Sequence, residues 1–283
     1  MSGFPLPSAG VVAVQAPGDG PGYWAGAPCA VLDADGSFVI AYRIRNGHGG
    51  NDQTVVARSS DGERFSTVAT LDESDFGAVG MERPALARTD EGRWRMWVCC
   101  ATSDSAHWWI DLLEADRPED LASAEPRPAF PGDARIGVKD PVVKRMNGSW
   151  QAWICCHLLD IPGEEDRMNT AYATSADGRD WEWRGVVLEG RDGLWDARGA
   201  RLTSVLPDGR ACYDGRASAQ ENWFERTGLA RLAQDGRVKA ENEDAAADVR
   251  YLDVLPLPSG GYRIYYEARL PDESHELRTE LID

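Results

Sequence analysis

The sequence predicts an all-β protein, a five-bladed β-propeller built from four-stranded antiparallel blades. Three observations favour this fold class. A unit of about 56 residues recurs along the chain, its segments resemble short apolar strands, and Gly and Pro interrupt them often. Helical periodicity is almost absent, and only residues 117–124 look like a short helical turn. Arranging such sheets radially around a channel protects their edges.

A glycine turn marks each repeat, between an apolar strand and a second strand that is rich in aromatic residues. The second strands at 94–100 and 150–156 have nearly the same pattern, Trp-x-x-Trp followed by an apolar residue and two cysteines. With spacings of 56, 56, 61 and 52 residues between turns, five units fill nearly the whole chain, so we expect residues 1–283 to form a single domain. The turn glycines are Gly36, Gly92, Gly148, Gly209 and Gly261.

A third strand is visible in two of the units, at residues 54–62 and 170–178. Each ends in Ser-x-Asp-Gly and is followed three residues later by an aromatic residue, a pattern typical of a hairpin turn. The fifth unit offers only three strands, the last at 276–282. We therefore expect residues 10–15 to supply the outer strand of the last blade.

The six cysteines lie inside apolar strand-like runs. Two pairs of them are adjacent in sequence, and neighbouring residues on a strand point to opposite faces, so a vicinal disulfide or a shared metal is not expected. We predict buried, reduced thiols, and we predict that Trp97 and Trp153 form core between blades. The cysteines are Cys29, Cys99, Cys100, Cys155, Cys156 and Cys212.

The chain carries a formal net charge of −17 with a pI near 4.7. A nucleic acid or an anionic membrane would be repelled by this field, and neutral or cationic ligands fit it better. The N-terminus lacks the features of a signal peptide and no run approaches the length of a membrane span, so the chain is expected to be cytoplasmic. Zinc-type spacing of His and Cys is absent, and no cofactor is expected, although Ca²⁺ in an acidic channel is chemically reasonable.

In a propeller the first strand of each blade begins at the face where the second strand ends, because consecutive strands are antiparallel. The polar residues at both places should therefore face one mouth of the channel. At the starts of first strands these are Glu82, Arg83, Asp140, Asp196, Arg198 and Asp253, and at the ends of second strands they are Arg43, Arg45, His48, His157, Asp214, Arg216 and Glu267.

The X-Pro strand starts, the glycine turns and the Ser-x-Asp-Gly-x-x-aromatic hairpins make the chain resemble the five-bladed propeller glycoside hydrolases, of which families 43, 32 and 62 are examples. The resemblance covers essentially the whole chain in architecture. It implies hydrolysis of a small glycoside or sugar-containing metabolite by carboxylates at the starts of the inner strands. One carboxyl would be protonated and the other ionised, about 5 to 9.5 Å apart according to whether configuration is retained or inverted.

The chain departs from that pattern in the first blade. Where the resemblance implies Asp-Pro, this sequence has Ala27 before proline. Carboxylates remain in the second blade, at Glu82, and in the third, at Asp140. Either the acid pair has moved to these two residues, with Asp196 or Asp253 across the channel, or the site binds a ligand without hydrolysing it.

The catalytic candidates are Glu82, Asp140 and Asp253. Glu82 is the expected general acid, because its side chain is longer and a crowd of carboxylates would raise its pKa. Asp140 would be the ionised base or a positioning group. The expected ligand-binding residues are Trp24, Arg45, Arg83, His157, Asp196, Arg198, Asp214, Arg216 and Glu267.

Two alternatives stay open at this point. Trp24 and Trp195 occupy matching places in two blades, where a platform for sugar stacking competes with plain packing between blades. The protein itself is either a glycosidase-like enzyme or a carbohydrate- or metabolite-binding propeller. A carboxyl with a raised pKa would favour the enzyme, whereas acids that are all neutralised by arginine would favour the binding protein.

Overall fold

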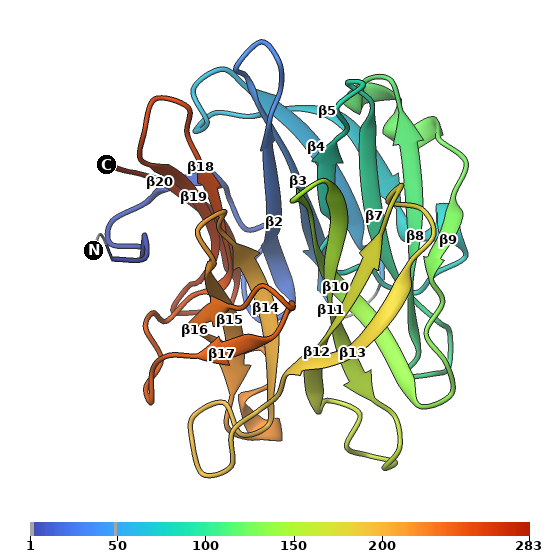
Figure 1. The fold of residues 1–283 in the computed structure, drawn as a ribbon, viewed down its shortest axis with the longest axis vertical. Helices are drawn as coiled ribbons and strands as arrows, with labels where there is room; N and C mark the ends of the chain where they lie inside the picture. Colours follow the sequence, from blue (N-terminus) through green and yellow to red (C-terminus); the bar gives the residue numbers. More distant parts are fainter. Residues whose placement is uncertain (1–2, 48–49) are drawn as a thin grey trace.

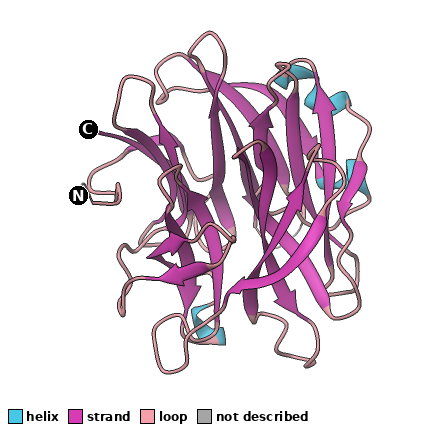
Figure 2. Ribbon diagram, viewed as in Figure 1, coloured by secondary structure: helices cyan, strands magenta, loops and turns pink. Residues whose placement is uncertain are grey.

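The structure, a computed structural model, describes residues 3–47 and 50–283. Twenty β-strands and three short 3₁₀-helices make up its regular elements (Figures 1 and 2). Apart from two single-residue parallel bridges, strand pairing divides the twenty strands into five four-stranded antiparallel units, which we call blades. The protein is an all-β propeller, as the sequence predicts.

The first three blades follow the chain without interruption, from the inner to the outer strand. Blade 1 contains β2 (Tyr23–Leu32), β3 (Phe38–Asn46), β4 (Gln53–Ser59) and β5 (Ser66–Asp72). Blade 2 contains β6 (Ala85–Arg88), β7 (Trp94–Ala101), β8 (Trp108–Ala115) and β9 (Arg127–Phe130). Blade 3 contains β10 (Ile136–Met146), β11 (Ser149–Leu158), β12 (Met168–Ser175) and β13 (Glu182–Leu188).

The fifth blade is closed by the N-terminal segment. β1 (Val11–Val14) pairs antiparallel with β20 (His275–Ile282), with Val11 opposite Thr279, which confirms the expected outer strand at residues 10–15. Figure 1 shows the two chain ends on the same side of the molecule.

Blade 4 contains β14 (Gly199–Val205), β15 (Arg210–Arg216), β16 (Arg226–Leu232) and β17 (Val238–Ala240). Blade 5 contains β18 (Arg250–Pro256), β19 (Tyr262–Arg269), β20 (His275–Ile282) and β1 (Val11–Val14).

All five predicted turn glycines lie in the hairpin between the first and second strands of a blade. Their φ angles are between 73° and 90°, a left-handed region that favours glycine. The predicted helical turn is the 3₁₀-helix Pro118–Ser123. The sequence pattern did not predict the other two 3₁₀-helices, Glu73–Phe76 and Ala219–Glu221. None of the described helices is long and apolar enough to cross a membrane.

The hydrophobic core lies between successive blades. Trp97 packs on Trp150 at a ring-centroid distance of 5.9 Å between blades 2 and 3, and Trp153 packs on Tyr172 at 5.4 Å. The prediction that Trp97 and Trp153 form core is confirmed. All six cysteines are buried free thiols, and burial raises the pKa of Cys155 to about 12.

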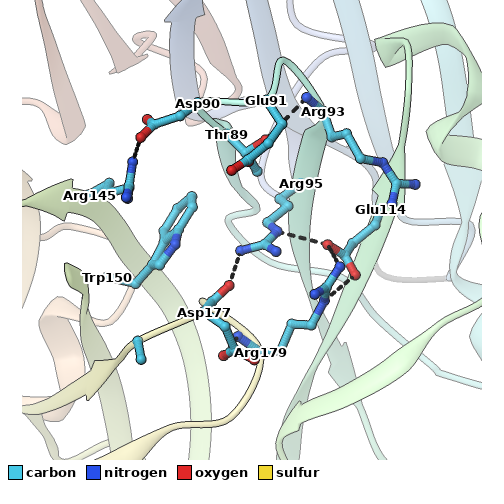
Figure 3. Close-up of a pocket in the computed structure, with 11 residues that line it drawn as sticks. Thr89, Asp90, Glu91, Arg93, Arg95, Glu114, Arg145, Trp150, Asp177 and Arg179 are labelled. Atoms are coloured by element: carbon cyan, nitrogen blue, oxygen red, sulfur yellow. Dashed lines mark hydrogen bonds and ion pairs between the residues drawn. The ribbon is translucent and has the colours of Figure 1, made fainter. Parts of the chain in front are cut away.

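An arginine on the second strand of one blade holds the Ser-x-Asp-Gly turn of the next. Arg95 on β7 donates to the carbonyl of Asp177 at 2.5 Å and lies over the ring of Trp150 (Figure 3). Arg263 on β19 donates to the carbonyl of Asp61 at 3.2 Å. Below, we call these two contacts the arginine clasps. The cavity of about 400 Å³ around the Arg95 clasp lies at the hairpin end of blades 2 and 3, away from the mouth.

Candidate functional site

A cavity of about 280 Å³ opens where the inner strands begin. We call it the mouth cavity. Five basic and four acidic side chains line it, together with one histidine and three aromatic residues. The lining residues are Arg45, Glu82, Ala106, Trp108, Lys139, His157, Glu165, Asp166, Arg201, Arg216, Asn222, Trp223, Glu225, Arg250 and Tyr251.

Strained backbone positions place two residues at the floor of this cavity. Ala27, Asp140 and Tyr251 occupy the same place in β2, β10 and β18, in a bulge where two residues oppose one on the second strand. Each has a φ near 50°, which is unusual for a residue other than glycine. Left-handed strain of this kind costs about 1–3 kcal/mol and clusters at functional sites. The first blade keeps the backbone of this position but presents only a methyl group.

The floor brings Glu82 and Asp140 to one hydroxyl. The Tyr251 hydroxyl lies 3.3 Å from Glu82 Oε2 and 3.4 Å from Asp140 Oδ2. Arg201 donates to the same hydroxyl at 2.9 Å and to Asp140 Oδ2 at 3.0 Å. Glu82 lines the mouth cavity, whereas Asp140 lies in the layer directly beneath it and is fully buried.

Arginines neutralise Glu82. Its carboxylate pairs with Arg43, with Arg45 at 3.1 Å and with Lys139 at 3.8 Å. Burial alone would raise the pKa of Glu82, but Arg43, Lys139 and Arg45 together hold it well below its usual range. The raised pKa expected for Glu82 is therefore wrong, and the role of general acid loses the reason for which it was assigned to this residue. That expectation counted neighbouring carboxylates but not the cations that converge on them.

Glu225 is neutralised in the same way. Arg216 approaches it to 2.6 Å and Arg250 to 2.8 Å. Burial would raise the pKa of Glu225, but the attraction of these two arginines outweighs it and lowers that pKa to about 2.

The other two lining acids also favour their ionised forms. A hydrogen bond from Arg198 lowers the pKa of Asp166, and a bond from the Gly163 amide lowers that of Glu165. All four acids that line the mouth cavity thus have lowered pKa values, and none is a proton donor at neutral pH.

Three more of the predicted acids lie below the cavity. Asp253 is buried in the channel, where Arg83 pairs with it at 3.3 Å and the Ala30 amide donates to it at 2.8 Å. Asp214 accepts from Arg201 at 2.8 Å, and burial raises its pKa. Neither Asp253 nor its partner Arg83 lines the mouth cavity.

Glu267 is the third buried acid. Arg43 and Arg250 each approach it to 2.9 Å, and burial is outweighed by these cations, so its pKa is lowered. A Cβ on residue 26 would lie 2.1 Å from Glu267 Oε2, so the glycine found there leaves room for this buried carboxylate.

Two predicted residues of blade 4 lie elsewhere. Asp196 accepts from Arg191 at 2.8 Å and from the Tyr213 hydroxyl at 2.7 Å, and it does not line the mouth cavity. The structure corrects its placement, because this aspartate sits in the loop before β14 and turns into its own blade. Arg198 does not line the cavity either, but it pairs at 2.6 Å with Asp166, which does.

The aromatic wall of the cavity differs from the predicted one. Trp24 is 2% exposed and stacks on His275 at 4.8 Å, so it offers no platform to a ligand. Trp195 packs on Tyr213, as the packing alternative expected. The aromatic residues that face the cavity are Trp108, Trp223 and Tyr251. Trp108 and Trp223 sit on or beside loops that the repeat pattern did not align.

Two basic groups in the cavity have no hydrogen-bond partner within residues 3–47 and 50–283. The Lys139 side chain is 9% exposed, and its ammonium lies 4.8 Å from the ring centre of Trp108. His157 is half-buried beside it on β11. Burial, followed by Lys139 and Arg216, lowers the pKa of His157 well below its usual value, so the imidazole is neutral. Lys139 was not among the predicted site residues, although it directly precedes Asp140.

A smaller cavity of about 190 Å³ adjoins the mouth and shares Arg45 and Trp108 with it. Asp52 lines it and pairs with Arg45 at 3.1 Å. Burial raises the pKa of Asp52 in spite of Arg45. Sequence reasoning missed this residue because it precedes a third strand, where no site residues were sought. His48, which was expected near the mouth, lies outside the described residues.

The channel does not fit a calcium ion. Glu82, Asp140 and Asp253 each accept from an arginine, which occupies the oxygens that the ion would need. In the described part of the chain, no group of three or more His, Cys, Asp or Glu side chains is arranged to hold a metal.

Comparison with known proteins identifies the fold. No protein-family model and no curated protein matches the sequence. The β-1,2-mannobiose phosphorylase from Listeria innocua, solved with β-1,2-mannobiose, is similar with a TM-score of 0.68 and 14% identity, over 91% of this chain and 89% of its own. Sucrose-6-phosphate hydrolase from Lactobacillus gasseri gives a TM-score of 0.68 and 12% identity, over 95% of this chain and 60% of its own. The chain thus shares the β-propeller fold of glycoside hydrolases and phosphorylases.

Proposed function

We propose that the mouth cavity binds a small sugar-containing ligand that bears an anionic group. The observation that carries this proposal is the pair formed by buried Lys139 and half-buried His157, two basic groups without hydrogen-bond partners in the described chain. Of the two alternatives that the sequence left open, we favour the ligand-binding propeller over the enzyme, because every acid that lines the cavity has a lowered pKa.

An anion would complete the bonding of both basic groups. Removing an ammonium from water without hydrogen bonds costs several kcal/mol. Glu82, at 3.8 Å from the Lys139 ammonium, attracts it electrostatically but is too distant to accept a hydrogen bond from it, and it already accepts from Arg43 and Arg45. A phosphate or carboxylate in the cavity would accept from Lys139, and it would favour protonation of His157, which would then donate as well.

The size and the walls of the cavity suit a sugar. About 280 Å³ accommodates only a small ligand, and the indoles of Trp108 and Trp223 offer apolar surface beside charged groups. The structural neighbours named above include an enzyme of mannobiose and an enzyme of a phosphorylated sugar. Net charge does not oppose a small anion here, because the cations that line the cavity act locally.

Titration calorimetry tests this proposal. We expect glucose 6-phosphate or mannose 6-phosphate to bind at least ten times more tightly than the free sugar, and Lys139→Met to abolish this preference. A tenfold change corresponds to about 1.4 kcal/mol. Lys144→Met, half-buried toward the far end of the same strand, is the matched control and should leave binding unchanged. Equal binding of phosphorylated and free sugars, or an unaffected Lys139 variant, would contradict the proposal.

The pH dependence of anion binding gives a second readout. Sulfate keeps its charge across the range, so any change comes from the protein. Because the bound anion raises the lowered pKa of His157, binding takes up a proton, and sulfate affinity should increase as the pH falls from 7 toward 5. His157→Gln should remove this dependence while the protein stays folded.

Cleavage of the glycosidic bond is the second candidate function. It is favoured by the Tyr251 hydroxyl, which joins Glu82 and Asp140 at the floor of the cavity. With Glu82 ionised, Asp52 is a carboxyl with a raised pKa that lines the adjoining cavity, whereas Asp214, whose pKa is also raised, lies buried below the mouth. A panel of aryl glycosides, tested with and without inorganic phosphate, should show turnover that falls at least about a hundredfold in Asp140→Asn or Asp52→Asn. Binding of sugar phosphates without turnover would leave ligand binding as the function.

A further inference from the structure

Another cavity, of about 370 Å³, lies between the outer strand of blade 2 and the outer strand of blade 3. We call it the lateral cavity. Phe130 at the end of β9, Ile136 and Val138 on β10, and Trp183 on β13 form its apolar walls. The segment that includes Gly132 and Gly137 separates it from the mouth, since these glycines pack against the backbone of Trp108. The two cavities are therefore distinct.

Trp183 is the most exposed part of these walls. Its side chain is 44% exposed, although Phe130 beside it is 3% exposed, with the two ring centres 6.5 Å apart. An indole that is held at one edge by a buried ring and open elsewhere is an ordered apolar platform. It loses little conformational entropy when a flat ligand covers it.

Two polar groups at the border of the cavity keep free bonding capacity. One oxygen of Asp133 accepts the amides of Arg135 and Ile136 at 2.7 and 3.0 Å, while its second oxygen has no partner in the described chain. Arg135 is exposed, and it and Arg64 are the described arginines that make no ion pair. Because every described arginine apart from these two pairs with an acid, the Arg135 guanidinium stands out as available to a ligand.

From this arrangement we infer that the lateral cavity is a second carbohydrate-binding site, which takes a neutral pyranose ring. The ring would stack one apolar face on Trp183 and share its hydroxyls between Asp133 and Arg135. A purely apolar ligand would leave both polar groups unused, and a charged ligand would be repelled by one of them. A neutral ring with hydroxyl groups satisfies the platform, the acceptor and the donor together. This inference does not depend on what the mouth binds.

Fluorine NMR of protein labelled with 5-fluorotryptophan tests the inference. The Trp183 resonance is assigned as the one missing in Trp183→Phe. The probes are the disaccharides and trisaccharides of β-linked mannose, glucose, xylose and galactose. We expect at least one series to shift this resonance with a millimolar Kd, and Arg135→Met to weaken that binding at least fivefold. Arg135 has no ion-pair partner to lose, so this variant should fold normally.

Two controls separate this site from the mouth. Lys139→Met should leave the Trp183 shift intact, and Trp223→Phe, which changes the exposed tryptophan of the mouth, should do the same. The inference is overturned if no sugar of the panel shifts the Trp183 resonance, or if the shift vanishes in Lys139→Met. It is also overturned if the resonance moves with protein concentration alone, because Trp183 would then belong to a contact between copies of the chain.

Discussion

At the scale of single residues, the mouth is crossed by a continuous series of buried side chains of alternating charge. It runs from Glu225 to Arg250, Glu267, Arg43 and Glu82, and so joins blades 4, 5, 1 and 2. Each member is at most 6% exposed, and every inner member has an opposite charge on both sides. Buried charges are tolerated only with such partners, because removing one leaves another uncompensated in a medium of low dielectric constant.

Replacing Glu82 should therefore weaken the fold as well as the site. In Glu82→Gln, Arg43 loses one of its two buried carboxylate partners, and breaking a buried pair costs about 3–5 kcal/mol. Urea unfolding measures the free energy directly. Glu63→Gln removes a half-exposed partner of Arg263 and should cost less than about 1 kcal/mol. If the two variants are equally stable, the alternating series contributes little to stability.

Glu82 and Asp140 could be placed at one mouth, because both precede strands with the same role in the repeat. The ion pairs of Glu82 with Arg43 and Arg45 were not predicted, because they depend on how far these two side chains extend from blade 1 toward blade 2. Alternation along β3 puts both arginines on one face, and this was the available clue.

The arginine clasps act at the scale of elements. Arg95 joins β7 to the β12–β13 turn, and Arg263 joins β19 to the β4–β5 turn, each across a blade boundary. In each turn the aspartate accepts backbone amides, which lowers the pKa of Asp61 and of Asp177 to about 2. The ionised carboxylate thus fixes the turn whose carbonyl the arginine binds.

Asp177 should make the stability of the protein depend on pH in the acid range. Its pKa of about 2 in the folded protein lies below its ordinary value of 3.8, so its contribution is full above pH 4 and is lost as the pH falls toward 2. Asp177→Asn should be less stable than the wild type at pH 7, and the difference should shrink between pH 4 and pH 2.5 in urea unfolding curves. Asp180→Asn is the control: its side chain lies in the same turn, accepts no backbone amide of the described chain and pairs with the exposed Arg127, so this variant should cost less stability at pH 7 than Asp177→Asn.

Elements were predicted better than sites, for a physical reason. Positive φ at Gly36 or Gly92 needs glycine, so the sequence itself reveals these turns. Ala27 and Tyr251 adopt a similar φ without glycine, because surrounding strands impose it. Nothing in their residue type reveals the bulge, and so Tyr251, which organises the floor of the mouth, was missed.

At the scale of the whole molecule, net charge and local charge have opposite signs. The chain carries −17, whereas the five basic and four acidic side chains that line the mouth cavity leave a net charge of +1 with His157 neutral. The mean field opposes polyanions such as nucleic acid, which must neutralise many phosphates over a large surface. It does not exclude a single phosphate in a cavity, where contacts at hydrogen-bond distance outweigh a field screened within about 10 Å at 0.1 M salt.

Closure of the ring is the other property of the whole molecule. β1 covers the outer edge of β20, and the Glu280 carboxylate accepts the amide of Ser8 at 2.8 Å. At the start of β1, a Cβ on residue 10 would lie 2.3 Å from the Tyr266 hydroxyl oxygen, so glycine is needed for this close approach. The N-terminal segment is thus fitted to blade 5 rather than laid loosely over it.

Removing residues 1–14 should therefore open blade 5. The deletion exposes the β20 edge and several backbone hydrogen bonds, each worth about 0.5–1.5 kcal/mol, so the free energy of unfolding should fall by at least about 2 kcal/mol. Val11→Ser, at a side chain that is 50% exposed, is the control and should change it by less than about 0.5 kcal/mol. A synthetic peptide of residues 1–14 should restore the melting temperature when added to the truncated protein. An unchanged melting temperature after the deletion would show that the other blades hold the ring without this strand.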